Sequence, residues 1–210
     1  TLVLVTSDNG PWYEGSSGGL RGRKGQSYEG GFRVPLLAWW PGTLRSGVSA
    51  TVPVMNIDFL PTFAALAGVA LPTDRVVDGR DLTPVLMGGS HDLHDRALYF
   101  FHDYDVEAVR IGQWKYIASN SHYVWPNPLD KMDSFAGRML SARNYSPPGS
   151  SESIPTLGEW PLLYHLGRDP RESYNVARHQ PDIQASMAER LASWRQGFYA
   201  DPRGMETAEQ

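Results

Sequence analysis

Two polar side chains with oxygen donors lie shortly after the first apolar run of the chain. Residues 2–5 are apolar and rich in β-branched side chains, and Asp8 and Asn9 follow them. A carboxylate and a carboxamide oxygen form a hard-oxygen donor pair, which suits Ca²⁺ or Mg²⁺ better than Zn²⁺. Asp-Asn-Gly is also ordinary chemistry for a turn that leaves a strand. The two residues are therefore either metal ligands or an Asx turn.

The second group is a basic, glycine-rich segment. Lys24 lies between Gly22 and Gly25, with further glycines and arginines on both sides. Glycine lets the backbone approach an anion closely, and a lysine ammonium is a compact charge that suits a tetrahedral oxyanion. The segment predicts a cradle for sulfate or phosphate in which Lys24 contacts the anion. The alternative is a solvated basic loop.

These groups need a scaffold that holds them together. An unbroken apolar run is typical of a strand buried on both faces of a parallel or mixed sheet, and ligands bind beyond the carboxyl ends of such strands. Gly68 and Asp58 give stop and cap signals for a helix. We expect the following further elements: a strand at 34–40, either an edge strand or a lead into the next helix at 51–54, a helix at 56–68, and a turn with a short helix at 78–88.

The pattern changes near residues 90–95, where a polar segment predicts a linker. We therefore expect two domains, residues 1–95 and residues 96–210. The second begins with short strands and a hairpin at Gly112. It ends with a helix that begins at Pro181, and we expect the tail after Gly197 to be frayed. The apolar residues of this helix recur at helical spacing: Ile183, Met187, Leu191 and Trp194. The Pro-, Ser- and Gly-rich segment 126–161 predicts either a lid or a mobile insertion.

Composition excludes several classes of protein. The chain has 210 residues, 41% of them hydrophobic, and a formal net charge of −4. That balance is typical of an ordinary globular protein and argues against a nucleic-acid partner. No apolar stretch approaches the length of a membrane span. Cysteine is absent, which excludes disulfides and thiolate metal sites.

Taken together, the two polar groups resemble a known family. Thr-Ser-Asp-Asn-Gly, followed by Leu-Arg-Gly-Arg-Lys-Gly-Gln-Ser-Tyr-Glu-Gly-Gly-Phe-Arg-Val-Pro, resembles the carboxyl-terminal half of a sulfatase of the arylsulfatase A type, in the alkaline phosphatase-like superfamily. The resemblance implies that Asp8 and Asn9 bind the metal, that Lys24 contacts the sulfate, and that Glu29 and Arg33 brace the loop.

The same resemblance implies the fold. It predicts an α/β protein made of the C-terminal part of an alkaline phosphatase-like mixed-sheet core and a small α+β domain with a short antiparallel sheet and a C-terminal helix. Two later segments are also similar to the family: Ala-Val-Arg-X-Gly-X-X-Lys at 108–115, and Leu-Tyr-His-Leu-Gly-Arg-Asp-Pro-Arg-Glu-Ser-Tyr-Asn at 163–175. His165 stands where the family usually has Asp, which we interpret as a surface change.

The family's nucleophile is missing from this sequence. Sulfatases of this type use formylglycine, made by oxidising a Cys or Ser in a Cys/Ser-X-Pro-X-Arg motif, and these 210 residues hold no such motif. The resemblance therefore predicts roughly the second half of a sulfatase, inactive without the N-terminal half that carries the formylglycine. The expected metal is Ca²⁺, with Mg²⁺ as the alternative.

Three functions remain open at this point. The first is hydrolysis of a sulfate ester, with His102 or His122 contacting the sugar or aryl part of the substrate unless they lie in a solvated loop. The second is a phosphatase or phosphodiesterase of the same superfamily, although those relatives typically have His at the position of Asn9. The third is a non-catalytic module that binds an anion or another subunit. We also expect the chain to self-associate, and the family suggests an exported protein.

Overall fold

The computed structural model of the protein describes residues 1–12, 14–89, 92–102, 105–119 and 160–202. They divide into two compact units, one formed by Thr1–Asp8 with Val34–Arg96 and the other by Asn9–Arg33 with Ala97–Gln210. The expected α/β class is confirmed. The glycine-rich segment groups with the C-terminal unit, whereas the sequence prediction placed it with the first domain.

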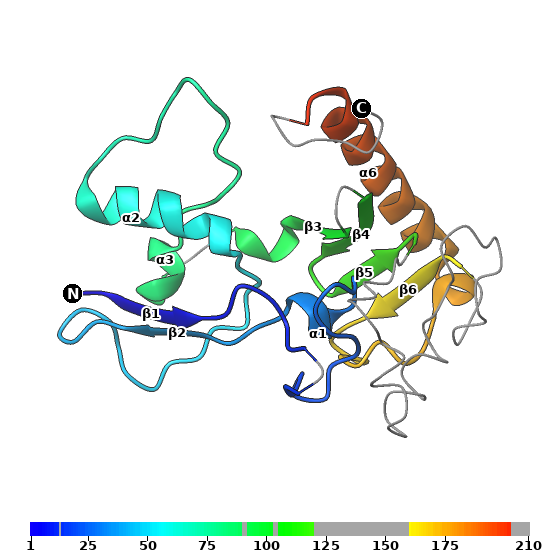
Figure 1. The fold of residues 1–210 in the computed structure, drawn as a ribbon, viewed down its shortest axis with the longest axis horizontal. Coiled ribbons are helices and arrows are strands. Elements are labelled where there is room, and N and C mark those ends of the chain that lie inside the picture. Colours follow the sequence, from blue (N-terminus) through cyan, green and yellow to red (C-terminus); the bar gives the residue numbers. More distant parts are fainter. Residues whose placement is uncertain (13, 90–91, 103–104, 120–159, 203–210) are drawn as a thin grey trace. The chain divides into compact units, whose positions relative to one another are not determined.

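The first unit holds a two-stranded antiparallel ribbon of β1 (Val3–Thr6) and β2 (Leu36–Trp39) (Figure 1). Directly opposite residues on such a ribbon point to the same face, so Val3 with Trp39 and Val5 with Leu37 form one apolar surface. The exposed fraction of the side chain is 38% for Val3, 63% for Trp39, 55% for Val5 and 64% for Leu37. The prediction of strands buried on both faces is therefore wrong for the described residues, because each of the two strands has only the other as its neighbour there.

The remainder of the first unit is mostly helical and loop structure. It contains α2 (Phe59–Ala67), which ends as predicted at Gly68 in the left-handed conformation, and α3 (Thr83–Leu86). The short helices η1 (Asn56–Asp58) and η2 (Leu93–Asp95) flank them in the chain. Of the two alternatives for 51–54, the edge strand does not form and the lead into the next helix does: Val52 packs against Leu82 and Leu93, and η1 begins at Asn56.

Asp58 is the polar centre of the first unit. Its buried carboxylate accepts the backbone N–H groups of Met55 and Arg80 at 2.7 and 2.9 Å and pairs with the buried Arg96 guanidinium at 2.8 Å. It makes no side-chain cap to α2, and its bond from the Met55 N–H instead belongs to the capping box of η1, the short helix that leads into α2. The ion pair fixes the end of the unit, because Arg96 is its last residue.

The second unit is built on a four-stranded antiparallel sheet in the order β3-β4-β5-β6. Its strands are β3 (Ala97–His102), β4 (Asp105–Ile111), β5 (Trp114–Ile117) and β6 (Leu162–His165). The predicted hairpin joins β4 to β5 and turns at Gly112, whose φ is +55°. The predicted short antiparallel sheet of the C-terminal part is thus confirmed.

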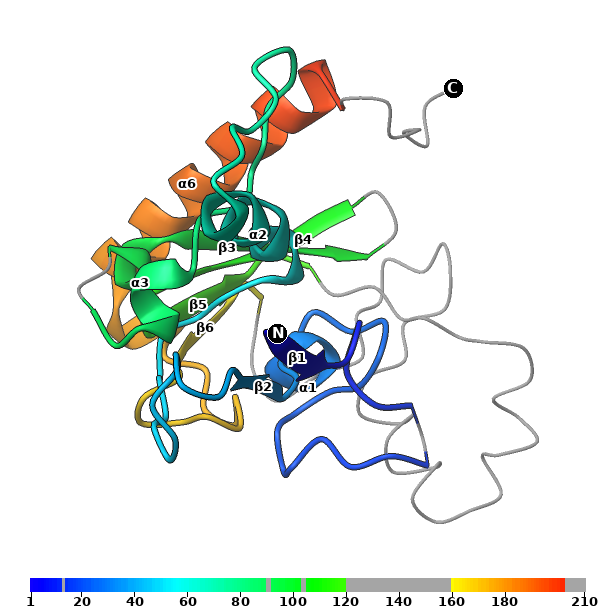
Figure 2. The same ribbon diagram turned by 90° about the vertical axis from the view of Figure 1, so that its left-hand side faces the viewer.

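The long helix α6 (Pro181–Ala200) covers one face of this sheet (Figures 1 and 2). Its buried Met187 and Leu191 pack with Val109, Tyr116 and Leu163 of the strands. The helix runs past Gly197 to Ala200, so the predicted fraying is wrong for residues 198–200, while residues 203–210 lie outside the described residues. Stacking of Trp194 on aromatic side chains of β3 and α6 accounts for the extension: Tyr99 and Phe198 lie at centroid distances of 4.2 and 5.2 Å.

The other face of the sheet carries the glycine-rich segment. This segment ends in a single helical turn, α1 (Glu29–Phe32), and Phe32 packs edge-on against Phe100 of β3. The short helix η3 (Ala177–His179) leads from β6 into α6. Among the helices in the described part of the chain, none combines the length and apolar character needed to cross a membrane.

Candidate active-site segment

Lys24, the predicted sulfate contact, is exposed on a loop whose backbone is held on both sides. The Lys24 N–H donates to the Pro11 carbonyl at 3.1 Å. Gly22 and Gly25 flank it closely, each with a φ of +82°, where side chains are rarely tolerated. Within the described residues Lys24 forms no ion pair that would neutralise its charge. The structure therefore presents an ammonium group to solvent on an ordered loop.

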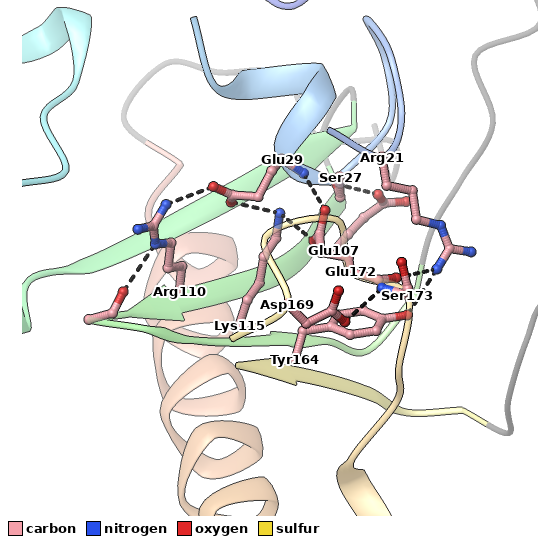
Figure 3. A network of polar contacts seen from close by, with 11 residues as sticks. Arg21, Ser27, Glu29, Glu107, Arg110, Lys115, Tyr164, Asp169, Glu172 and Ser173 are labelled. Carbon is pink, nitrogen blue, oxygen red and sulfur yellow. Dashed lines mark hydrogen bonds and ion pairs between the residues drawn. The ribbon is translucent and has the colours of Figure 1, made fainter. Parts of the chain in front are cut away.

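The loop is anchored through Glu29 to the polar face of the four-stranded sheet (Figure 3). Glu29 is buried and pairs with Arg110 of β4 at 2.7 Å and with Lys115 of β5 at 3.1 Å. Arg110 and Lys115 are direct cross-strand partners, so both cations face the same side. This confirms that Glu29 braces the loop, as the resemblance implied. Arg33 has an exposed side chain and contributes its backbone N–H to the Glu29 carbonyl at 2.7 Å.

A second buried carboxylate, that of Glu172, completes the cluster. One of its oxygens lies 3.1 Å from Lys115 Nζ, and the other accepts the Glu29 N–H at 2.7 Å. Lys115 also lies 3.9 Å from the centre of the Phe100 ring, an additional favourable contact for a cation. Glu29, Lys115 and Glu172 are all fully or almost fully buried. We refer to these three residues as the buried ion cluster.

A β-bulge supplies a further anchor for the loop. The pairing of β3 with β4 shifts between Phe100↔Ala108 and Phe101↔Val106, so Glu107 has no counterpart on β3. Bulges redirect side chains, and here the buried Glu107 carboxylate accepts a hydrogen bond from the Ser27 hydroxyl at 2.5 Å. A residue of the loop two positions before Glu29 is thereby tied to the sheet.

Arg21 fixes the opposite end of the loop. Its guanidinium donates to the Tyr164 hydroxyl at 3.1 Å and to the Glu172 carbonyl at 2.8 Å, and it lies 4.2 Å from the centre of the Tyr28 ring. Burial raises the pKa of Tyr28 to about 12 against the opposing effect of Arg21. Tyr28 therefore stays protonated at neutral pH.

The two carboxylates of the ion cluster have pKa values displaced in opposite directions. Burial acts to raise the pKa of Glu29, but Lys115 and Arg110 together outweigh it and hold that pKa below its ordinary value. Burial also raises the pKa of Glu172, and Lys115 offsets this only in part while the charge on Glu29 adds to it. Ionisation of Glu172 is thus the less favourable of the two.

The turn after β6 is shaped to deliver Glu172. Asp169 accepts the backbone N–H groups of Ser173 and Tyr174 at 2.7 and 2.8 Å. Asn175 accepts the Leu163 N–H at 3.0 Å and so ties the turn to β6. Glu172 itself has a φ of +53°, an uncommon conformation for a residue with a side chain. Each polar residue of the Asp-Pro-X-Glu-X-X-Asn pattern therefore has a distinct structural role.

The residues that anchor the loop through Glu29 were not among the site residues predicted from sequence. Arg110 and Lys115 both occur in the Ala-Val-Arg-X-Gly-X-X-Lys segment, and Glu172 occurs in the 163–175 segment, so the signal was present as family pattern without an assigned role. His165 is half-buried and packs edge-on against Trp114, with ring centroids 4.6 Å apart, so its interpretation as a surface change is wrong.

The histidines predicted to contact substrate have different outcomes. His102 is the last residue of β3, and its Nδ1 atom lies 2.8 Å from the carbonyl oxygen of Gly25. Gly25 is the residue that follows Lys24 in the chain. His122 lies outside the described residues. A substrate contact by either residue stays a prediction.

Asp8 and Asn9 follow β1 as the sequence predicted. Asp8 is exposed, and the Asn9 amide nitrogen donates to the Gly10 carbonyl at 2.9 Å. Their oxygen atoms suit Ca²⁺ or Mg²⁺ chemically, but two residues supply fewer donors than the six to eight oxygens that Ca²⁺ usually takes. Across the described part of the chain, no three His, Cys, Asp or Glu side chains gather in a group that could hold a metal ion. These two residues fit a metal as part of a ligand set.

Comparisons with known proteins agree with this arrangement of loop, sheet and helix. Residues 1–69 match the sulfatase family, and residues 93–209 match the family described as the C-terminal region of aryl-sulfatase. The chain is 39% identical to human arylsulfatase A over 186 residues, covering 84% of this chain and 33% of that protein. It is 36% identical to steryl-sulfatase of Rattus norvegicus, covering 83% of this chain and 31% of that protein.

A solved structure shows the same fold. The PsFucS1 sulfatase from Pseudoalteromonas sp. superposes with a TM-score of 0.68 at 23% identity, covering 94% of this chain and 37% of that one. The chain belongs to the sulfatase family and corresponds to its C-terminal region. It spans about a third of the length of these two curated relatives, where the sequence prediction was roughly half.

The ion cluster makes a testable prediction about pH. A carboxyl group whose pKa is lowered by folding stabilises the protein above its ordinary pKa of 4.5, and this contribution disappears as the pH falls through the lowered value. We expect Glu29→Gln to destabilise by about 3–5 kcal/mol at neutral pH, because it leaves buried cations uncompensated. This penalty should shrink at acid pH.

Glu172→Gln should show the opposite trend. A carboxyl group with a raised pKa stabilises the fold below its ordinary value of 4.5 and loses that contribution as the pH rises through the raised pKa. The penalty for Glu172→Gln should therefore decrease as the pH rises. Urea unfolding from about pH 3 to pH 8 measures both trends, with the exposed Glu189→Gln on α6 as control. Parallel pH profiles for Glu29→Gln and Glu172→Gln would contradict the assignment.

Proposed function

We propose that the protein containing this chain hydrolyses sulfate esters and that Lys24 contacts the sulfate group. The observation that carries the proposal is the exposed, unneutralised Lys24 on a glycine-rich loop. Three side-chain contacts anchor this loop to the four-stranded sheet, and a fourth anchors it to the turn after β6. Membership of the sulfatase family supports the choice of sulfate over phosphate.

In this proposal the residues of the chain have separate tasks. The Lys24 ammonium offsets negative charge on the sulfuryl oxygens, an interaction that gains strength where water is excluded. Asp8 and Asn9 contribute oxygen ligands to a Ca²⁺ ion, with Mg²⁺ as the alternative, and such an ion would polarise a sulfate oxygen. The formylglycine nucleophile is expected from the N-terminal part of a sulfatase. The sulfate ester itself is the proposed substrate, and an exported location follows from the resemblance alone.

The two alternative functions receive less support. A phosphatase with two zinc ions needs imidazole ligands, whereas the residue after Asp8 is Asn9. A non-catalytic anion-binding module would use the same Lys24 loop. A sulfatase and such a module differ in activity. The module would bind sulfate without hydrolysing esters in any longer protein that contains this chain.

Substitution of Lys24 tests the proposal. In the complete protein, Lys24→Ala should lower kcat/KM about ten- to a hundredfold, because a charge-assisted hydrogen bond to the sulfuryl group is lost. Stability should hardly change, since the side chain is exposed. Lys24→Arg should rescue poorly, because a planar fork does not replace a compact charge between two glycines. Steady-state kinetics with an aryl sulfate measures the effect.

The control must remove a nearby positive charge without disturbing the loop. Arg23 is unsuitable, because its guanidinium donates to the carbonyls of Trp12 and Gly15 at 2.7 and 3.1 Å. Arg171 is exposed, and its guanidinium lies beside Gly19 of the loop, so Arg171→Ala removes charge alone. Equal losses in Lys24→Ala and Arg171→Ala, or full activity of Lys24→Ala, would show that Lys24 is not a sulfate ligand.

We further expect the 210-residue chain by itself to lack arylsulfatase activity and to bind Ca²⁺ only weakly. Asp8 and Asn9 provide two ligand residues, and the proposed nucleophile is not in the sequence. Titration calorimetry with Ca²⁺, compared with an Asp8→Ala variant, measures the affinity. Binding in the micromolar range or tighter would contradict this expectation and reveal ligands beyond these two.

Self-association of the 210-residue chain is also part of the proposal. The ribbon of β1 and β2 exposes Val3, Val5, Leu37 and Trp39 on one face, and a contiguous apolar surface tends to find a partner. Leu37→Ser and Trp39→Ser should each reduce the associated fraction in light scattering, whereas Val76→Ser, an exposed residue outside the ribbon, should not. A strictly monomeric wild-type chain would contradict the expectation.

A further inference from the structure

We propose that His102 is a positioning residue for Lys24 and acts through the backbone of Gly25 instead of touching the substrate. The inference rests on the proposed function, because Lys24 is the group that it would position. It changes the role expected for His102 from sequence and assigns a task to the contact between β3 and the loop.

The chemistry of the contact defines its direction. His102 Nδ1 lies 2.8 Å from the Gly25 carbonyl oxygen. A carbonyl oxygen can only accept, so the Nδ1 atom carries the hydrogen in this bond. Gly25 directly follows Lys24, and the bond therefore orients the first carbonyl group after the lysine. The Lys24 N–H is held on the preceding side by Pro11 at 3.1 Å.

The loop depends on such a bond more than an ordinary segment would. Gly25 has a φ of +82°, and glycine without a partner samples many other conformations. Loss of the bond should therefore spread Lys24 over several positions. A misplacement of about 1 Å at a reacting centre can cost roughly a hundredfold in rate. In this proposal His102 limits the positions that Lys24 occupies and does not itself bind the substrate.

His102 is supported by a paired strand. The residue belongs to β3, which pairs along its length with β4, and Phe100 of the same strand packs against Phe32 and Lys115. Groups held on strands are placed more accurately than groups on loops. The loop beside Lys24 is therefore tied to a hydrogen-bonded strand of the sheet.

Two substitutions separate positioning from substrate contact. The amide nitrogen of Asn stands at the same distance along the side chain as Nδ1, whereas that of Gln corresponds to Nε2. In the complete protein, His102→Asn should retain kcat/KM within about threefold, and His102→Gln should lose about ten- to a hundredfold. The reverse order would place Nε2 at the substrate and overturn the proposal.

A double-mutant cycle tests whether the effect passes through Lys24. If His102 only positions Lys24, adding His102→Gln to Lys24→Ala should cost little beyond Lys24→Ala alone. Additive losses would overturn the proposal, since they mean an independent contribution by His102. Full activity of His102→Gln with an impaired Lys24→Ala would refute the role of His102 alone, whereas full activity of Lys24→Ala would refute the proposed function as well.

A spectroscopic measurement on the 210-residue chain gives a readout without activity. The sequence contains three lysines, Lys24, Lys115 and Lys131, so ¹³C-dimethylation gives a simple spectrum in which Lys24→Arg identifies the Lys24 signal. We expect this signal to shift or broaden in His102→Gln and to stay at its wild-type position in His102→Asn. An unchanged signal in His102→Gln would overturn the proposal even if that variant lost activity through poor folding.

Discussion

The shared use of Lys115 by two buried carboxylates is the constraint on which the C-terminal unit depends. Lys115 pairs with Glu29 and Glu172 at 3.1 Å each, away from solvent. Removing charges from water is costly, and the cost is offset only when all partners are in place. The three residues come from distant parts of the chain, so the loop that carries Glu29 reaches its native position only when β5 and the turn after β6 are formed. The geometry of the loop therefore depends on the sheet of the C-terminal unit, although the loop precedes the strands of that sheet by many residues.

The two faces of the sheet divide stability from specificity. On the α6 face, Met187 and Leu191 bury apolar surface, which is non-directional and tolerates some variation in shape. On the opposite face, Arg110 and Lys115 demand defined distances and angles from Glu29. This arrangement also explains the exposed charge on Lys24. The Glu29 carboxylate of the same loop is occupied by cations of the sheet, so it does not neutralise the lysine that this loop presents to solvent.

Much of the local structure was predictable because local signals decide it. The left-handed stop at Gly68, the hairpin at Gly112 and the amphipathic helix after Pro181 follow from neighbouring residues alone. The prediction that Glu29 braces the loop came from family resemblance, and the partners of Glu29 could not be assigned, because ion pairs between residues 29, 115 and 172 leave no periodic pattern in the sequence. Burial of β1 was predicted wrongly for a related reason: an apolar run shows that a strand requires neighbours, but not that the described residues supply them.

The basic residues of the loop show how the same charge serves two purposes. Arg21 and Arg23 donate from their planar guanidinium groups to backbone carbonyls and so act as braces within the fold. Arg21 contacts one carbonyl and Arg23 contacts two. Lys24 has no fork with which to bridge several carbonyls, and its side chain extends into solvent. Counting positive charges along the segment could not separate these roles, since all three residues raise the local potential equally at long range. The distinction arises from donor geometry: arginines that satisfy carbonyls hold the loop, and the one lysine among them keeps its charge available for an anion.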